Sequence, residues 1–431
     1  MWRATIAWLG WVLCVGLGCG PNPAAPGPTV PAEEFGEEEA SVWMALVVER
    51  LEADRFSPPR ASRVLGYSGV GIYEAVVYGS RDLETLSGRL NGLEALPAPD
   101  TRALDFPTVV HGTMGHLLPV LFAEEESRAR IAEVLAEQVE AREAAGVSAE
   151  VLDRSYNRGV LLAEVIAGWA ADDGYGLREQ GLHSPPVGDH VWVPTSVENP
   201  GPMEPFWGTL RPFAMPGADA CRPPEPVPFS VEPDSAFYQE AYEVWEVSQT
   251  LTADQEHIAR FWADDPGETA TPPGHWMALA RQMAAERELN LAEAAELYAL
   301  VGITAADAFI SCWEEKYRSY LVRPVTYIRE HIDPEWETLI GTPPFPEYTS
   351  GHSNISGASA KVLTALLGEF PFEDRTHEGR GLGIRRFESF EHAAQEAAIS
   401  RLYGGIHYPM GIDHGLPQGE CVAQFVVDLI R

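Results

Sequence analysis

The chain has 431 residues, and its 64 Asp and Glu against 30 Lys and Arg give a formal net charge of −34. Such an acidic surface repels nucleic acids and anionic membranes, so both are excluded as expected partners. The length allows one large domain or two ordinary ones with an ample core. Because basic residues are scarce, any cluster of them is informative.

The N-terminus has the features of an export signal. A single arginine precedes an apolar run from Ile6 to Leu17 that is too short to span a membrane comfortably. We therefore expect a signal peptide over residues 1–18 and a linker rich in Pro, Ala and Glu over residues 19–37. A small residue before Cys19 is typical of a bacterial lipoprotein site, although Gly16 stands where a larger aliphatic residue is usual. The sequence predicts export to the bacterial periplasm or outer surface and leaves lipid attachment at Cys19 open.

The remaining cysteines show no close spacing. Cys221, Cys312 and Cys421 lie far apart, so neither a zinc site nor a disulfide framework is expected. Cys312 and Cys421 stand in apolar helical contexts and are expected to be small core residues. We expect no membrane-spanning helix after the signal, because no later apolar run approaches the necessary length.

Helical periodicity dominates the rest of the sequence, and alternating apolar strands are hard to find. Helices are expected over residues 41–54, 61–78, 108–122, 125–144, 148–171, 252–262, 276–288, 291–320, 351–367, 390–403 and 415–430, with a further one from about residue 236. This pattern predicts an all-α fold of two bundles with about four to five helices each. The N-terminal helical part would cover residues 38–235 and the C-terminal bundle residues 236–431.

An irregular segment interrupts this pattern between residues 172 and 234. Gly, Pro and Trp are frequent there, and the segment contains two histidines, His183 and His190, and two tryptophans, Trp192 and Trp207. A long irregular excursion in a helical protein is usually functional or a lid. The aromatic residues favour a packed segment, and its role is left open.

A short motif stands at the predicted start of helix 351–367. A proline-rich segment leads to Ser350, Gly351 and His352. A helix N-terminus offers unpaired N–H groups and a partial positive charge, which suit an oxyanion. A hydroxyl and an imidazole there could bind the anion and move protons around it. Alone, the motif is more often a helix cap, so its meaning depends on cations elsewhere in the chain.

Two basic stretches could supply these cations. Lys316 and Arg323 are seven residues apart, which places them two turns apart on one face of a helix that the next proline ends. Arg401 and His407 would point to different faces of a continuous helix. The intervening Gly404-Gly405 predicts that the helix ends, so that the following loop folds His407 back toward Arg401. Each stretch alone is also compatible with a solvated face or an idle loop histidine.

Together these motifs resemble the three-part signature of a superfamily. It joins vanadium-dependent haloperoxidases with type 2 phosphatidic-acid phosphatases and class A acid phosphatases, and the matching residues are Lys316, Arg323, Ser350, Gly351, His352, Arg401 and His407. Trp313, Phe345 and the stretch 261–265 favour the haloperoxidase branch. Two positions depart from the pattern: Thr349 replaces a proline, and Gly411 stands where an Asp commonly follows the last histidine by four residues, with Asp413 displaced by two.

The resemblance implies a role for each residue. Lys316, Arg323 and Arg401 would neutralise the equatorial oxygens of bound vanadate, and Ser350 and the Gly351 N–H would add hydrogen bonds. His407 would be the vanadium ligand and His352 the acid–base group, with Lys316 assisting peroxide polarisation. Trp313 and Phe345 would wall the pocket. Asp265 is the expected partner of Arg401, with Asp264 as its rival, and His275 is the one further histidine of interest.

The resemblance therefore predicts an exported vanadium-dependent haloperoxidase that uses hydrogen peroxide, a halide and an organic acceptor, in a family whose members often dimerise. The alternative is an exported acid phosphatase with the same pocket and His407 as the phosphorylated nucleophile. The displaced Asp413 weakens this alternative, because that carboxylate orients the nucleophilic histidine in the phosphatases. A lipoprotein that only binds an oxyanion is a third reading, disfavoured by the intact His352 and His407. The preferred halide is left open.

Overall fold

The computed structural model of this protein describes residues 29–99, 102–177, 183–196 and 201–430. The predicted signal peptide over residues 1–18 and Cys19 lie outside the described residues. The C-terminal end of the predicted linker lies within the described residues and belongs to the fold. Ala32 is fully buried, and the Phe35 carbonyl accepts a hydrogen bond from the Leu291 N–H at 2.8 Å.

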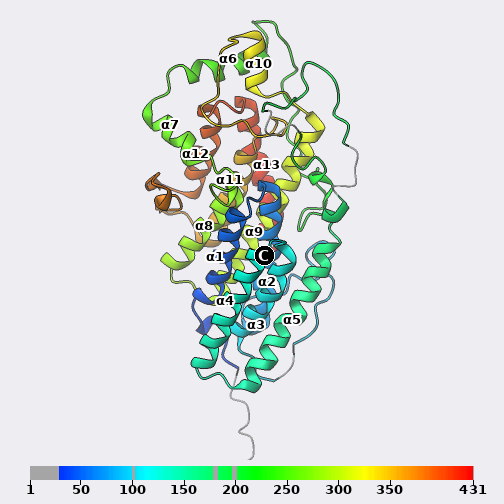
Figure 1. Cartoon of the computed structure of the whole chain (residues 1–431), viewed down its shortest axis with the longest axis vertical. Helices are drawn as coiled ribbons and strands as arrows, with labels where there is room; N and C mark the ends of the chain where they lie inside the picture. The colour runs from blue at the N-terminus through cyan, green and yellow to red at the C-terminus, as the bar shows by residue number, and fades with distance from the viewer. Residues whose placement is uncertain (1–28, 100–101, 178–182, 197–200, 431) are drawn as a thin grey trace, which may run out of the picture.

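The regular structure of the described chain is almost all helix, with very little sheet, so the all-α prediction is confirmed (Figure 1). Its helices are α1 (Glu38–Ala53), α2 (Pro58–Val76), α3 (Phe106–Leu121), α4 (Glu125–Ala144), α5 (Ala149–Ala171), α6 (Ala236–Ser248), α7 (Ala253–Phe261), α8 (Thr271–Glu286), α9 (Leu291–Ser319), α10 (Pro324–His331), α11 (Gly351–Leu367), α12 (Phe390–Tyr403) and α13 (Pro409–Val427). A hairpin of β1 (Phe372–Asp374) and β2 (Arg385–Phe387) pairs Phe372 with Phe387 in antiparallel register.

Helices α4, α11 and α12 have the predicted bounds, whereas α8 and α13 begin earlier than predicted. The loop expected around Pro409 is the first turn of α13. Proline is tolerated there because its missing N–H would have no partner in the helix anyway. The short helix α10 and the hairpin were not predicted, since eight and three residues respectively are too few to display a period.

Helix α9 runs through the centre of the molecule, with α2 to α5 toward one end and α6, α7 and α10 toward the other (Figure 1). Helix α2 packs backbone to backbone along α9. A Cβ added to Gly69 would lie 2.5 Å from the Tyr298 carbonyl oxygen, and one added to Gly302 would lie 2.5 Å from that of Leu65. Only glycine allows this approach.

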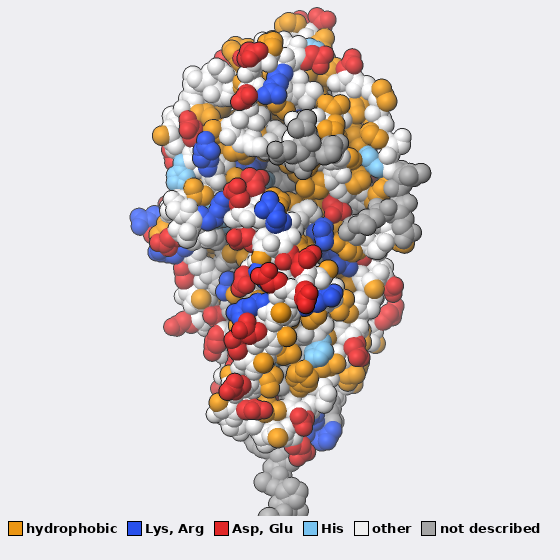
Figure 2. Space-filling model, in the orientation of Figure 1, with side chains coloured by type: hydrophobic (Ala, Val, Ile, Leu, Met, Phe, Trp, Pro, Cys, Tyr) orange, Lys and Arg blue, Asp and Glu red, His pale blue; other side chains and the backbone are white. Residues whose placement is uncertain are grey.

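One hydrophobic cluster extends from Ala32 to Val427 and includes residues of both predicted bundles. The parts expected over residues 38–235 and 236–431 therefore share a core. A smaller cluster covers α6, α10 and the adjoining faces of α12 and α13. Acidic side chains are scattered over the face shown in Figure 2, with basic ones between them.

Contrary to the sequence prediction, α9 is long and apolar enough to cross a membrane by length and composition, and among the described helices it is the one that meets this test. Its most apolar stretch is 94% buried inside the protein. Burial of this kind is what a central core helix requires.

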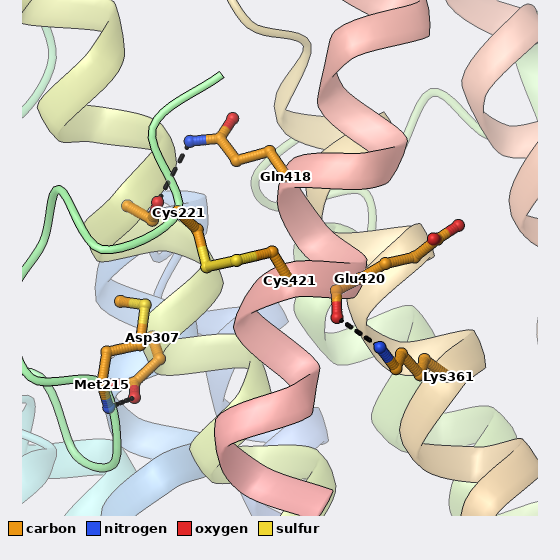
Figure 3. The surroundings of a disulfide bond; sticks show 8 residues. Met215, Cys221, Asp307, Lys361, Gln418, Glu420 and Cys421 are labelled. Atoms are coloured by element: carbon orange, nitrogen blue, oxygen red, sulfur yellow. Dashed lines mark hydrogen bonds between the residues drawn. A yellow bond between two sulfur atoms is a disulfide. The ribbon is translucent and has the colours of Figure 1, made fainter. Parts of the chain in front are cut away.

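The irregular segment 172–234 is fastened to the helices at several points. The buried carboxylate of Asp307 on α9 accepts hydrogen bonds from the N–H groups of Phe213, Ala214 and Met215 at 2.6, 2.8 and 2.9 Å. Close by, Cys221 forms a disulfide with Cys421 on α13 (Figure 3).

This disulfide corrects the expectation that no cysteines pair and that Cys421 is a core residue. Cys421 is exposed, and its partner comes from a segment without periodicity, so no pattern in the sequence brings the two together. Cys312 is buried and free, as expected of a core residue.

Candidate active site

A cavity of about 400 Å³ lies where the proline-rich segment, the start of α11 and the connection between α12 and α13 meet. Several predicted site residues line it, namely Trp313, Phe345, Gly351, His352, Arg401 and His407, together with both candidate carboxylates, Asp264 and Asp265. Lys316, Arg323 and Ser350 are fully buried and do not appear on its wall. The structure thus gathers the predicted residues into one place, in two layers.

Ser350 is the N-cap of α11. Its Oγ accepts a hydrogen bond from the Ser353 N–H at 3.2 Å, and its own N–H donates to the Gly411 carbonyl at 2.9 Å. The next residue, Gly351, lines the cavity. The capping role and the oxyanion role are therefore compatible, because the cap fixes the helix end whose free N–H groups face the cavity.

His352 presents a free ring nitrogen. Its Nε2 is buried without a hydrogen-bond partner among the described residues. Burial, followed by the charge of Arg401, lowers the pKa of His352 well below its ordinary value, against a hydrogen bond with the Trp262 backbone. The imidazole is neutral at pH 7, and its free nitrogen is available for proton transfer.

His407 lies on the five-residue connection between α12 and α13, and it lines the cavity together with Arg401. Its Nδ1 is 2.7 Å from Glu347 Oε1, and its Nε2 is 3.2 Å from Arg323 Nη1. The Arg323 guanidinium can only donate, so this network assigns the lone pair to Nε2 and the proton to Nδ1. Burial, and then Arg323, lower the pKa of His407 well below its usual range, which keeps the ring in the form that binds a metal.

Arg323 does not share a helix with Lys316, contrary to the prediction. Helix α9 ends at Ser319, and Tyr320 adopts a left-handed conformation with φ of 52°. The connection that follows runs beside the irregular segment, where the Val322 N–H donates to the His190 carbonyl and the Trp192 N–H to the Tyr320 carbonyl, both at 2.8 Å. The spacing of seven residues could not reveal this change of direction.

The Arg323 guanidinium is only partly satisfied. Nε donates to the Phe345 carbonyl and Nη1 to the Ile406 carbonyl, each at 2.8 Å. Nη2 is buried and has no partner within the described chain. An unpaired buried donor on a cation is costly, which indicates a place for an acceptor that the protein itself does not supply.

Lys316 is directed at the backbone. Its Nζ donates to the carbonyls of Pro346 and Glu347 at 3.1 and 2.9 Å, and also to that of Thr349. Burial lowers the pKa of Lys316 to about 8. All three donors of the ammonium are used, so Lys316 shapes the segment that leads to Ser350. Its contact with peroxide stays a prediction.

Arg401 Nε donates to Ser400 Oγ at 2.9 Å and Nη2 to the Ala259 carbonyl at 3.1 Å. Burial lowers the pKa of Arg401 to about 10, and the charge of Asp264, followed by that of Asp265, opposes the shift. Asp264 is buried and Asp265 exposed. By charge and burial, the rival candidate Asp264 is the stronger electrostatic partner of Arg401.

Asp264 also belongs to a buried cluster around His275. The two ring nitrogens of His275 lie 2.8 Å from Asp264 Oδ2 and 2.8 Å from Asp374 Oδ2, and His377 Nε2 lies 3.0 Å from Asp264 Oδ1. Although burial opposes it, the two carboxylates raise the pKa of His275 to about 10. Asp264, His275 and His377 are close enough to share a metal ion, but a doubly hydrogen-bonded imidazolium accounts for the short distances without one.

Sequence reasoning missed Glu347. It is fully buried, and burial raises its pKa to about 7 against the charges of Lys316 and Arg323. A signal was present, because Glu347 is the one charged residue between Pro343 and Gly351. A charge in such an apolar stretch indicates a buried partner.

The residues present fit vanadate. The three cations Lys316, Arg323 and Arg401 outnumber the two buried carboxylates of Glu347 and Asp264 and suit an anion. Arg323 Nη2 and His352 Nε2 are buried without partners among the described residues, and the lone pair of His407 Nε2 is the remaining ligand. Fold and site together define a helical oxyanion-binding protein of the haloperoxidase and phosphatase superfamily.

Comparisons with known proteins narrow this class. The VCPO second helical-bundle domain matches residues 296–431. Vanadium chloroperoxidase of Curvularia inaequalis is 26% identical over 226 residues, which cover 38% of this chain and 36% of that protein. The chain thus matches only about a third of the length of this curated relative.

Solved structures match over nearly the whole chain. The first bacterial vanadium-dependent iodoperoxidase has a TM-score of 0.86 and 38% identity, covering 92% of this chain and 96% of its own. A holo bacterial vanadium-dependent chloroperoxidase has a TM-score of 0.66 at 14% identity, with coverage of 87% and 93%, and is similar in fold alone. The chain belongs to the vanadium-dependent haloperoxidase family.

Proposed function

We propose that this protein is an exported vanadium-dependent haloperoxidase that oxidises a halide with hydrogen peroxide to a hypohalous-acid-type halogenating species. The observation that carries the proposal is the pairing of a neutral His407, whose Nε2 holds a lone pair that faces Arg323 Nη1 at 3.2 Å, with the unpartnered Nη2 of Arg323. One group suits the metal and the other suits its oxygens.

Each residue has a task in this reaction. When bound, vanadate supplies a Lewis acid that polarises hydrogen peroxide for attack by a halide. Arg323 and Arg401 balance the negative charge of the oxygens, and His407 Nε2 is the ligand atom. His352 Nε2, which is neutral and has no partner among the described residues, takes up and returns the peroxide proton. Trp313 and Phe345, whose ring centroids are 4.9 Å apart, restrict water on one side.

Iodide is the halide we propose first, because the similar iodoperoxidase is 38% identical over 92% of the chain. The disulfide between Cys221 and Cys421 supports export, since such bonds persist in oxidising compartments. We also propose that the enzyme halogenates an organic acceptor and forms a homodimer. Lipid attachment at Cys19 would anchor the exported protein to a membrane. Comparing wild type with a Cys19→Ser variant by membrane fractionation would test this attachment.

An acid phosphatase is the second candidate, and Glu347 favours it more than the sequence did. The displaced Asp413 argued against an oriented nucleophilic histidine, but Glu347 supplies a carboxylate at 2.7 Å from His407 Nδ1. The same pocket could therefore support a phosphorylated His407.

One experiment separates the two candidates. Purified apo protein is assayed for iodide and bromide oxidation by peroxide, with and without orthovanadate, and in parallel for phosphate-ester hydrolysis. We expect vanadate-dependent halide oxidation that His407→Ala abolishes and the exposed control His392→Ala retains. No halide oxidation with vanadate, together with hydrolysis that His407→Ala abolishes, would establish the phosphatase instead.

A further inference from the structure

We propose that Glu347 is the positioning residue of His407, and that Gly411 is required because the Glu347 carboxylate occupies the place of a side chain at that position. The inference rests on the proposed function insofar as His407 binds vanadium. The arrangement of the two residues can be tested without the metal.

Glu347 joins two segments that are distant in sequence. Its Oε1 lies 2.7 Å from His407 Nδ1 and accepts a second hydrogen bond from the Tyr408 N–H at 3.0 Å. One oxygen therefore fixes both the ring and the backbone of the connection between α12 and α13. All of these groups are buried, so water does not compete for them.

Glu347 is itself firmly held. Its N–H donates to the Leu321 carbonyl at 3.0 Å, and its carbonyl accepts from Lys316 Nζ at 2.9 Å. The charges of Lys316 and Arg323 favour its ionised form. Lys316 thus acts on His407 indirectly, by fixing the backbone from which the carboxylate projects.

Gly411 provides the space for this carboxylate. A Cβ added at Gly411 would lie 2.3 Å from Glu347 Oε1, closer than any non-bonded contact allows. At this position the superfamily commonly carries an Asp, so the two arrangements exclude each other. In this chain the carboxylate comes from the segment before α11, and residue 411 on α13 is a glycine.

The chemical consequence concerns the His407 tautomer. Glu347 Oε1 already accepts from the Tyr408 N–H, and Arg323 Nη1, which can only donate, faces His407 Nε2 at 3.2 Å. The ring proton therefore lies on Nδ1, where Oε1 accepts it, and Nε2 keeps its lone pair. In Glu347→Gln the side chain keeps its shape, but its amide can rotate and donate to Nδ1. The ring proton would then move to Nε2, where it blocks coordination and also faces the Arg323 Nη1 donor at 3.2 Å.

The first test uses apo protein labelled with 15N on histidine. Two-dimensional NMR of the imidazole nitrogens should report the Nδ1–H tautomer of His407 in wild type and a shift toward Nε2–H in Glu347→Gln. Glu240→Gln is the matched control, because Glu240 is a half-buried carboxylate that accepts from the neighbouring Met410 N–H at 2.8 Å. An unchanged His407 tautomer in Glu347→Gln would overturn the proposal.

The second test measures orthovanadate binding to the apo protein by equilibrium dialysis. We expect Glu347→Gln to weaken binding by roughly 10- to 100-fold, as is common for residues that orient metal ligands, and Glu240→Gln to change it by less than about twofold. Gly411→Ala should also weaken binding while retaining the carboxylate. Full affinity in both Glu347→Gln and Gly411→Ala would contradict the inference.

A relocation variant guards against misfolding as the cause. Glu347→Ala/Gly411→Asp moves the carboxylate onto α13 and should recover part of the affinity and the Nδ1–H tautomer that Glu347→Ala loses. A double variant no better than Glu347→Ala, at equal thermal stability, would count against positioning. If wild-type apo protein binds no orthovanadate, the proposed function fails, while the tautomer comparison still decides the role of Glu347.

Discussion

Removing the disulfide is expected to destabilise the protein by several kcal/mol. The change is Cys221→Ser/Cys421→Ser, which avoids leaving a single free thiol. The two cysteines are separated by 200 residues, so the bond closes a large loop in the unfolded chain. The loop-entropy relation gives about 5 kcal/mol for a loop of this size at 25 °C.

This magnitude translates into a measurable change in the melting temperature. An unfolding entropy of about 2.1 cal/mol/K per residue, summed over roughly 400 ordered residues, gives about 0.85 kcal/mol/K. A loss of about 5 kcal/mol then lowers Tm by about 6 °C. The irregular segment keeps its three hydrogen bonds to Asp307, so we expect the variant to fold.

The assay is thermal and guanidinium unfolding followed by tryptophan fluorescence, for wild type and variant, each with and without dithiothreitol. Reductant should lower the stability of wild type to that of the variant and leave the variant unchanged. A difference below about 1 kcal/mol, with the disulfide verified in wild type by mass spectrometry, would refute the entropy argument. Free thiols at both Cys221 and Cys421, in addition to the free Cys312, in protein isolated from an oxidising compartment would refute the bond itself.

Further variants test the site. His407→Ala should abolish orthovanadate binding, whereas His352→Ala should bind it and lose peroxide turnover; tight binding by the His407 variant in equilibrium dialysis would overturn these roles. Arg323→Lys keeps the charge but not the three-pronged donor geometry, so affinity for orthovanadate should fall by about tenfold or more; an unchanged affinity would mean that Nη2 does not contact the anion. His275 has a folded pKa of about 10 against about 6.5 when unfolded, so its stabilisation is complete below pH 6.5 and is lost as the pH rises through 10. The difference in unfolding free energy between wild type and His275→Gln should therefore shrink from pH 7 to pH 10, and a difference that grows would refute the paired imidazolium.

Much of the fold could be predicted from sequence because a long amphipathic helix shows its hydrophobic period within its own sequence. In helices α4, α11 and α12 the helical periodicity continues over several turns and the ends are clearly marked, and their predicted bounds agree with the structure. The bounds of α8 and α13 were missed because their first turns contain proline and glycine, which also mark loops. The hairpin of β1 and β2 depends on pairing between distant residues and has no local signal.

The site could be predicted as a set of residues but not as a geometry. The sequence motifs predicted that His352, Arg401 and His407 lie close together, and in the structure these residues line one cavity. The turn at Tyr320, which takes Arg323 off α9, depends on contacts with the irregular segment. Glu347 was missed because its partner, His407, is 60 residues away, and only the fold brings the two within 2.7 Å.

The backbone contact between α2 and α9 limits whether the C-terminal part of the chain can be produced as a separate protein. The site residues all lie after residue 260, which suggests a portable C-terminal module. Helix α9, which carries Trp313 and Lys316, would then present to solvent the face that α2 covers, including the glycine at 302 where the helices touch. A fragment of residues 236–431 should aggregate when expressed alone, and co-expression with residues 29–235 should restore it as a two-piece protein. Since one hydrophobic core includes residues of both halves, the site is expected to form only in the complete helical body.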